Sequence, residues 1–128
     1  RLRRGVMRFI AKPGILELKI ARKVQALGLP FELWPHRDTC DILITLPDSH
    51  AIAVDAKDHR DIDRLERSIE GDDMRETMAA SEAIYVVPAD TPPPRRRAAN
   101  RRLAHKPGYS IKTLRELTQH LKTEMGDA

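Results

Sequence analysis

The sequence has a single cysteine, Cys40, and few aromatic side chains: two phenylalanines, one tryptophan and two tyrosines. One cysteine cannot form an internal disulfide, and it excludes the usual cysteine-rich structural zinc site. The five histidines show no zinc-ligand spacing either. So few aromatic rings argue against nucleic-acid binding by base stacking. We expect Cys40 to be a small buried thiol rather than a reactive one.

Longer signals are missing as well. No apolar run reaches the roughly 18 residues that cross a bilayer, and no signal-peptide pattern is present, so we expect a soluble cytoplasmic protein. There is no glycine-rich nucleotide-binding loop and no Gly-x-Ser-x-Gly nucleophile elbow. A length of 128 residues predicts a single domain over 1–128. Because the first residue is Arg1, we expect a processed form or an excerpt of a longer protein.

Charge is segregated along the chain. Residues 1–12 carry five basic and no acidic side chains, residues 91–106 carry six basic and no acidic ones, and residues 13–90 carry nine basic against sixteen acidic ones. An acidic centre between basic ends suits a metal-dependent enzyme acting on a polyanion, although either basic segment could be only a solvated surface. The arginines expected to bind nucleic acid are Arg4, Arg8, Arg95, Arg96, Arg97, Arg101 and Arg102.

The first half of the chain predicts one helix followed by three strands. After a lead-in over 1–12, Pro13-Gly14 opens a helix that ends before Gly28-Leu29-Pro30. Its apolar stripe consists of Leu16, Ile20, Val24 and Leu27. A first strand follows over 31–34 and should stop at Pro35. Residues 40–57 then supply two further strands as a hairpin.

The second half predicts a helix, a buried strand and a C-terminal segment. The helix begins near Asp61, is interrupted at 71–73 and is followed by a strand over 83–88 that should be covered on both faces. A helix between strands implies a parallel pairing. Beyond the prolines at 92–94 we expect a short basic helix from Arg95, within a Pro/Arg-rich segment over 89–106. Residues 107–128 should add an edge strand and a last helix that begins with a Thr113/Glu116 capping box.

The hairpin carries acidic residues that a purely structural strand would not need. Alternation of side chains places Asp55 and Lys57 on one face of their strand. A loop with an odd number of residues, such as 47–49, would bring Asp41 to that same face, whereas a two-residue loop would turn it away. Glu17, at the edge of the first helix's apolar stripe, is expected to face the sheet.

These residue types suit phosphodiester hydrolysis. Asp41, Asp55 and the backbone carbonyl of Ala56 offer hard oxygen ligands for Mg²⁺ or Mn²⁺. Lys57 would orient or help deprotonate the attacking water, and Glu17 would complete a second ion site or hold a water on the metal. The alternative is an ordinary cross-strand ion pair between Asp41 and Lys57, with Asp55 solvated.

The order and spacing of Glu17, Asp41 and Asp55-Ala56-Lys57 resemble the PD-(D/E)XK, or restriction-endonuclease-like, nuclease superfamily. The resemblance covers residues 13–88 and implies an α/β fold with an αβββαβ core, a mixed central sheet flanked by helices and a C-terminal helical appendage. It implies that Asp41 and Asp55 are the two acidic ligands, that Lys57 is the motif lysine and that Glu17 is the first-helix glutamate. Cys40 stands where the motif often has proline, and Asp55 stands where glutamate is commoner.

Four stretches, at 4–10, 13–18, 32–35 and 53–58, are more narrowly similar to the nuclease modules that accompany prokaryotic PIWI-like proteins (pPIWI-RE). This similarity implies an Mg²⁺- or Mn²⁺-dependent endodeoxyribonuclease that serves in defence against foreign DNA. Its partners would be DNA, a PIWI-like protein and a second copy of the chain. The alternative function is a catalytically inactive nuclease-fold module that binds nucleic acid or assembles with a partner protein.

Overall fold

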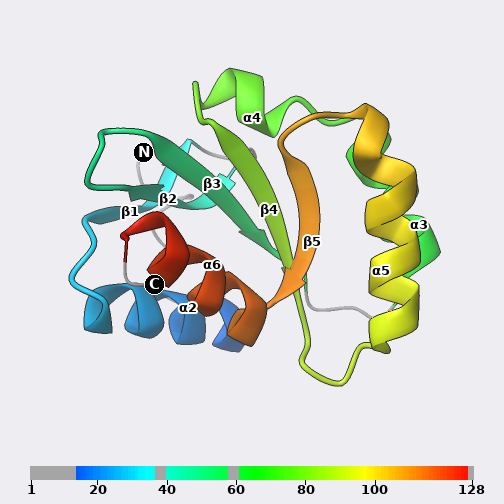
Figure 1. The fold of residues 1–128 in the computed structure, drawn as a ribbon, viewed down its shortest axis with the longest axis horizontal. Helices are drawn as coiled ribbons and strands as arrows, with labels where there is room; N and C mark the ends of the chain where they lie inside the picture. The colour runs from blue at the N-terminus through cyan, green and yellow to red at the C-terminus, as the bar shows by residue number, and fades with distance from the viewer. Residues whose placement is uncertain (1–13, 37–39, 58–60, 127–128) are drawn as a thin grey trace, which may run out of the picture.

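A five-stranded mixed sheet forms the centre of the protein, as the computed structural model shows for residues 14–36, 40–57 and 61–126 (Figure 1). The spatial order of the strands follows the chain: β1 (Phe31–His36), β2 (Cys40–Thr45), β3 (Ala51–Ala56), β4 (Glu82–Val87) and β5 (Tyr109–Thr113). β2 is antiparallel to both β1 and β3, whereas β4 is parallel to both β3 and β5. The predicted hairpin and the predicted parallel pairing are both confirmed.

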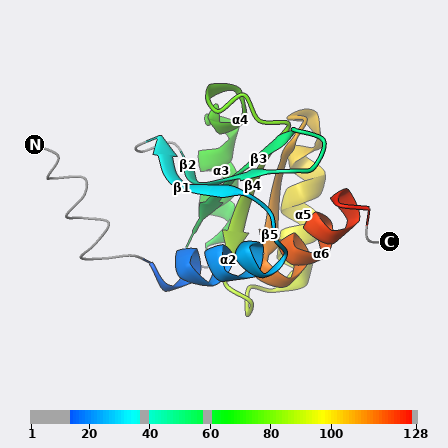
Figure 2. The ribbon, with the colours of Figure 1, turned by 90° about the vertical axis from the view of Figure 1, so that its left-hand side faces the viewer.

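Helices cover both faces of this sheet (Figure 1). α2 (Ile15–Ala26) and α6 (Leu114–Glu124) lie next to each other on one face, which Figure 2 shows from the side. α3 (Ile62–Glu70) and α5 (Pro93–Arg102) pack together on the other face. A short α4 (Met74–Thr77) precedes β4, and a 3₁₀ turn, η1 (Leu103–His105), follows α5. This arrangement confirms the predicted α/β class with a restriction-endonuclease-like core.

Two apolar clusters hold the helices on the sheet. On the α2/α6 face, Ile20, Val24, Leu117 and Leu121 pack against strand residues that include Ile84. On the α3/α5 face, the buried helix residues Ile62, Leu65, Ile69, Ala99 and Leu103 pack against strand residues that include Tyr85. Complete burial of each Ile or Leu contributes about 1.5–3 kcal/mol relative to exposure. β4 is buried on both faces from Ala83 to Val87, as its continuous apolar run predicts.

Two strand and helix boundaries differ from prediction at prolines. β1 does not stop before Pro35 but runs to His36, and its pairing with β2 shifts between Leu33 and His36. β1 is an edge strand and its pairing is irregular here, so the missing N–H of Pro35 does not cost the sheet a hydrogen bond between central strands. α5 begins at Pro93 rather than at Arg95. Prolines suit a first helical turn because its N–H groups have no partner within the helix.

The C-terminal segment extends the central sheet rather than hanging from it. β5 adds a parallel strand to β4, and α6 buries Leu117 and Leu121 in the apolar cluster shared with α2. The predicted capping box is confirmed, because Glu116 Oε1 accepts the Thr113 N–H at 2.9 Å and Thr113 Oγ1 accepts the Glu116 N–H at 3.3 Å. Within the described ranges, no helix combines the length and apolar character that crossing a membrane requires.

Candidate active site

The β2–β3 hairpin has the register that the chemical interpretation requires. Ile42 pairs with Val54 and Ile44 with Ile52. At the turn, the Leu46 N–H donates to the His50 carbonyl at 2.8 Å, which leaves only Pro47, Asp48 and Ser49 between these two residues. The predicted odd-numbered loop is therefore confirmed, and the register leads to facing positions for Asp41 and Asp55.

β2 and β3 separate at this pair of acids. Backbone pairing between the two strands ends at Ile42 and Val54. One step further, the Ala56 N–H donates to the carboxylate Oδ2 of Asp41 at 2.8 Å. The neighbouring Cys40 thiol is buried and donates to the Ile42 carbonyl at 3.0 Å, as expected for a structural cysteine. The Asp41 side chain thus accepts a backbone hydrogen bond at the position where β3 no longer pairs with the β2 backbone.

The surroundings of Asp41 disfavour the ionised form of its side chain. Partial burial, a hydrogen bond that the protonated Asp41 carboxyl group donates to the Asp55 carboxylate, and the Asp55 charge raise the pKa of Asp41 to about 8. The Ala56 N–H acts in the opposite direction, and the Glu17 charge adds a smaller increase. A carboxyl group whose pKa is raised this far is typical of functional sites, and a bound cation would relieve its repulsion with the neighbouring carboxylate.

Lys57 lies beside this pair. Its Nζ is 2.8 Å from Asp55 Oδ2, and the two side chains are only 31% and 17% exposed. Burial by itself would lower the pKa of Lys57, but the hydrogen bond and charge of Asp55, helped by Asp41 and Asp72, raise it above the usual value. Lys57 is therefore a cation at neutral pH. Within the described residues its ion-pair partner is Asp55, not Asp41, so the alternative Asp41–Lys57 pair is not the arrangement found.

Glu17 lies in the first turn of α2, partly buried. Its Oε1 accepts the N–H of Gly14, the residue before the helix, at 3.2 Å, which is a helix-capping role that we did not predict. Its charge reaches Asp41, as the pKa of that group shows. Even so, the carboxylates of Glu17, Asp41 and Asp55 are not among the described groups of three whose oxygens all lie within 4.8 Å of one another. The structure brings Asp41, Asp55 and Lys57 together and leaves Glu17 at their edge.

Two residues near the site were missed by sequence reasoning. Tyr85 pairs with Asp55 across β3 and β4, and its buried hydroxyl donates to the Asp72 carboxylate. Burial, followed by that hydrogen bond, raises the pKa of Tyr85. The sequence indicates Asp72 only as part of the break after α3. The parallel pairing could have hinted at Tyr85, but its register depends on the length of the crossover and cannot be read from strand patterns.

The predicted nucleic-acid-binding arginines have different environments. Arg95, Arg97 and Arg101 are exposed on α5. Arg102 is also exposed but forms a two-point ion pair with Glu66, with distances of 2.7–3.0 Å. Arg96 is only 7% exposed and binds the Thr91 carbonyl and Glu116, at 2.9 Å from Oε2. Arg96 therefore does not fit a direct phosphate contact. Arg4 and Arg8 lie outside the described residues.

The family described as "REase associating with pPIWI_RE" matches residues 14–128. The chain belongs to this family. The match runs from the start of α2 through α6 and includes every described candidate residue, which confirms the narrower resemblance noted for the sequence. Comparison with curated proteins and with solved structures gave no match.

Membership in the pPIWI_RE-associated REase family gives the acidic pair a chemical context. The family description indicates a restriction-endonuclease-like module that associates with pPIWI_RE proteins. Asp41, Asp55 and Lys57 lie where β2 and β3 separate, on the side of the sheet that bears Tyr85. The site thus combines two close carboxyl groups, a lysine cation and a backbone amide.

Proposed function

We propose that this chain is a metal-dependent endonuclease that hydrolyses phosphodiester bonds in DNA and serves in defence together with a pPIWI_RE protein. The observation that carries the proposal is the close Asp41–Asp55 pair with Lys57 Nζ 2.8 Å from Asp55. Family membership supports the nuclease class and the partner. The nature of the nucleic acid, the metal and the defence role are parts of the proposal.

The residues present fit a divalent cation. Mg²⁺ and Mn²⁺ prefer oxygen ligands, and Asp41, Asp55 and the Ala56 carbonyl would supply them. Burial, the hydrogen bond to Asp55 and the Asp55 charge raise the pKa of Asp41, and a cation would offset each of these by stabilising the ionised carboxylate. When bound, the ion would supply positive charge to the phosphate oxygens and make a water molecule more acidic.

The protein's own groups have separate roles in this proposal. The Ala56 N–H fixes the direction of the Asp41 carboxylate, because it holds Oδ2 at 2.8 Å. Asp55 holds Lys57 at the edge of the pair. Since the pKa of Lys57 is raised, we assign it to donating hydrogen bonds to the phosphate and the attacking water, rather than to removing a proton. Glu17 would bind a second ion or a water after a shift of its side chain.

Arginines would supply the affinity for DNA. Arg95, Arg97 and Arg101 are exposed on α5, and phosphate contacts of this kind give salt-dependent binding without sequence preference. Arg102 would contribute once its ion pair with Glu66 opens. Arg4 and Arg8, outside the described residues, are proposed as further phosphate contacts. A homodimer would let two active sites cut both strands of a duplex.

The test is cleavage of plasmid DNA with Mg²⁺ or Mn²⁺ by the purified protein, alone and with its pPIWI_RE partner. We expect Asp55→Asn and Lys57→Ala to lower the cleavage rate by at least about 100-fold while salt-sensitive DNA binding remains. Lys23→Ala, which removes an exposed lysine on α2, is the matched control and should cut like the parent protein.

Two other outcomes of this experiment would contradict the proposal. Cleavage at the parent rate by both site variants would overturn the assigned site. If the parent binds DNA but does not cut it, even with the partner present, the chain is a non-catalytic binding or assembly module of the same fold.

A further inference from the structure

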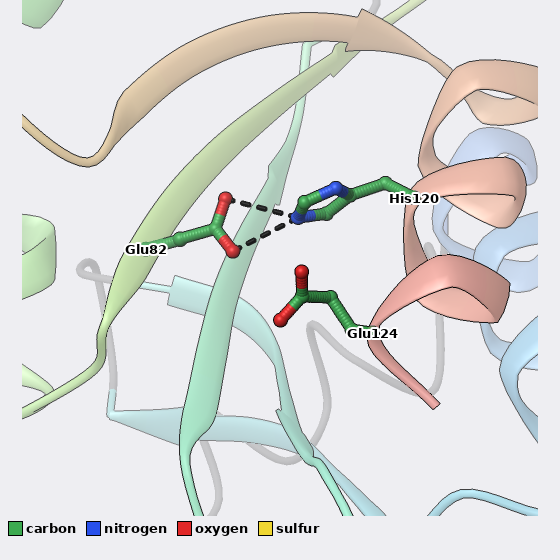
Figure 3. Close-up of side chains that lie close together, drawn as sticks. All are labelled: Glu82, His120 and Glu124. Atoms are coloured by element: carbon green, nitrogen blue, oxygen red, sulfur yellow. Dashed lines mark hydrogen bonds and ion pairs between the residues drawn. The ribbon is translucent and has the colours of Figure 1, made fainter. Parts of the chain in front are cut away.

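A second group of ligand-bearing side chains lies away from the acidic pair. Glu82 at the start of β4 faces His120 and Glu124 on the last turns of α6 (Figure 3). His120 Nε2 lies 2.8 Å and 3.0 Å from the two carboxylate oxygens of Glu82. Each of the three residues offers one ligand atom, and these atoms all lie within 4.8 Å of one another.

This group is distinct from the proposed catalytic site. In the parallel β3–β4 pairing Glu82 lies beside Ile52, whereas Asp55 lies beside Tyr85. Three residues along a strand correspond to about 10 Å. The faces also differ, because Glu82 contacts α6 while Tyr85 packs in the apolar cluster of α3 and α5. Neither site can share a ligand with the other.

The charges in this group favour a cation over a simple ion pair. Glu82 and Glu124 both bring a carboxylate to His120, so the three side chains keep one negative charge even when the histidine is protonated. Lys112 acts on Glu82 from outside this group. Glu124 also lies in the last turn of α6, where the unpaired carbonyl ends of a helix repel a negative side chain. Lys122, the basic residue of that turn, is not one of the three ligand residues. A divalent ion would compensate the two carboxylates and the helix end together.

The donor set indicates the type of ion. One imidazole nitrogen and two carboxylate oxygens suit Zn²⁺ and similar transition metals, whereas Mg²⁺ strongly prefers oxygen alone. Tetrahedral zinc with such ligands spaces its donor atoms by about 3.4 Å. Ligand atoms that already lie within 4.8 Å need to move by only about 1 Å. Glu124 is exposed and free to make that adjustment, and solvent can fill the fourth position.

We propose that Glu82, His120 and Glu124 form a structural site for a divalent transition-metal ion, with Zn²⁺ as the ligand to test, that fastens α6 to β4. His120 and Glu124 are four residues apart, so both face the strand from one side of the helix. Because Glu82 comes from a different element, a bound ion would cross-link the C-terminal helix to the central sheet. Stability, rather than catalysis, is the expected readout.

The experiment measures Zn²⁺ affinity by competition with a chromophoric chelator, together with the Tm. The reference protein carries Asp41→Asn and Asp55→Asn, so that the proposed catalytic site cannot contribute. We expect one Zn²⁺ per chain, an increase in Tm with Zn²⁺ and no comparable increase with Mg²⁺. His120→Ala and Glu124→Gln should each weaken Zn²⁺ binding by at least about tenfold, because even second-shell losses cost 10–100-fold.

Glu124→Gln is the decisive variant because it removes a ligand from an exposed position and keeps the Glu82–His120 pair. His105→Ala is the matched control, since His105 forms a similar pair with Glu70 at 2.9 Å and belongs to no described group of three ligands. Unchanged affinity in the control and a tenfold loss in Glu124→Gln support the site. Equal affinity in Glu124→Gln and the reference, or no Zn²⁺ binding by the reference, overturns it.

Discussion

The Asp41 carboxylate accepts the backbone N–H of Ala56 at 2.8 Å, at the point where β2 stops pairing with β3. One residue therefore offers its N–H to orient a proposed ligand and its carbonyl as a further ligand. The cost of this arrangement falls on Asp41, because burial and the neighbouring Asp55 both disfavour its charge. A cation bound between these two carboxyl groups, as proposed, would offset that cost.

Replacing Asp41 with asparagine should stabilise the metal-free protein. The pKa of Asp41 is raised from 3.8 to about 8 in the folded state, so between these pH values the folded protein holds a proton that the unfolded chain has released. The free energy of unfolding must fall as the pH rises through this range. Asn cannot ionise and still accepts the Ala56 N–H. We expect it to add roughly 1–3 kcal/mol at pH 8, since solvent screens part of the effect.

Denaturant unfolding at pH 5 and pH 8, without metal, checks this prediction. The gain from Asp41→Asn should be larger at pH 8, and Mn²⁺ should stabilise the parent protein but not the variant. Glu32→Gln on β1, an exposed acid, provides the control and should change stability little at either pH. A variant that is less stable than the parent at pH 8 would contradict the assigned cause.

Much of this site was predictable from the sequence because it depends on local geometry. Alternation along β3 and the length of the loop fix the faces of Asp41 and Asp55, and both rules hold here. The side-chain partners were not predictable in the same way. Lys57 forms its ion pair with Asp55, its neighbour along the chain. Arg96 is buried because the packing of α5 determines which of its arginines face the core.

The fold shows the same division. Apolar spacing predicted α3 and α6, and a continuous apolar run predicted the central strand β4. The boundaries predicted at prolines were wrong in β1 and α5, because an edge strand and a first helical turn both accept proline. Asp72 and Tyr85 come from segments whose contact depends on how α3 and α4 cross the sheet. No local pattern contains that information.

Cys40 should be nearly inert to thiol reagents while the protein is folded. Burial, reinforced by the charges of Asp55 and Asp41, raises its pKa from 9.0 to about 12. The reactive thiolate is then about a thousandfold rarer than in an ordinary cysteine. A disulfide reagent at pH 8 should react at least about 100-fold more slowly with folded than with unfolded protein. Ser68→Cys, which adds an exposed thiol on α3, is the positive control and should react at once. Fast reaction of Cys40 in the folded protein would contradict the prediction and show that β2 opens readily.

Two neighbouring arginines of α5 should differ in their effect on stability when replaced by methionine. Arg96 is 7% exposed and joins the Thr91 carbonyl to Glu116. Its loss leaves a buried carbonyl unpaired and should lower the free energy of unfolding by about 2 kcal/mol. Arg97 is exposed, so its replacement should change stability by no more than about 0.5 kcal/mol.

DNA binding separates the same two variants. Arg97→Met should weaken binding and reduce the salt dependence by about one phosphate contact, if the exposed side of α5 faces DNA as proposed. Arg96→Met should leave the salt dependence unchanged at temperatures where it is folded. Titrations at several salt concentrations, paired with denaturant unfolding, give both readouts. If the Arg96→Met protein is stable but its DNA binding depends less on salt, Arg96 does contact phosphate and the prediction is wrong.

A side chain at Gly108 should destabilise the protein. Its φ is +85°, and a methyl group there would lie 2.6 Å from Arg75 Cδ and 3.1 Å from the Ser81 carbonyl. The Gly108 carbonyl also accepts the Ala83 N–H at 2.7 Å, so a shift of this turn would disturb the start of β4. Gly108→Ala should therefore lower the free energy of unfolding by about 1–3 kcal/mol.

Gly71 provides the control. It has φ −98° and no other atom within 4 Å of the added methyl group, so Gly71→Ala should be neutral or slightly stabilising. Denaturant unfolding of the two variants compares them directly, and equal stabilities would contradict the strain assigned to Gly108.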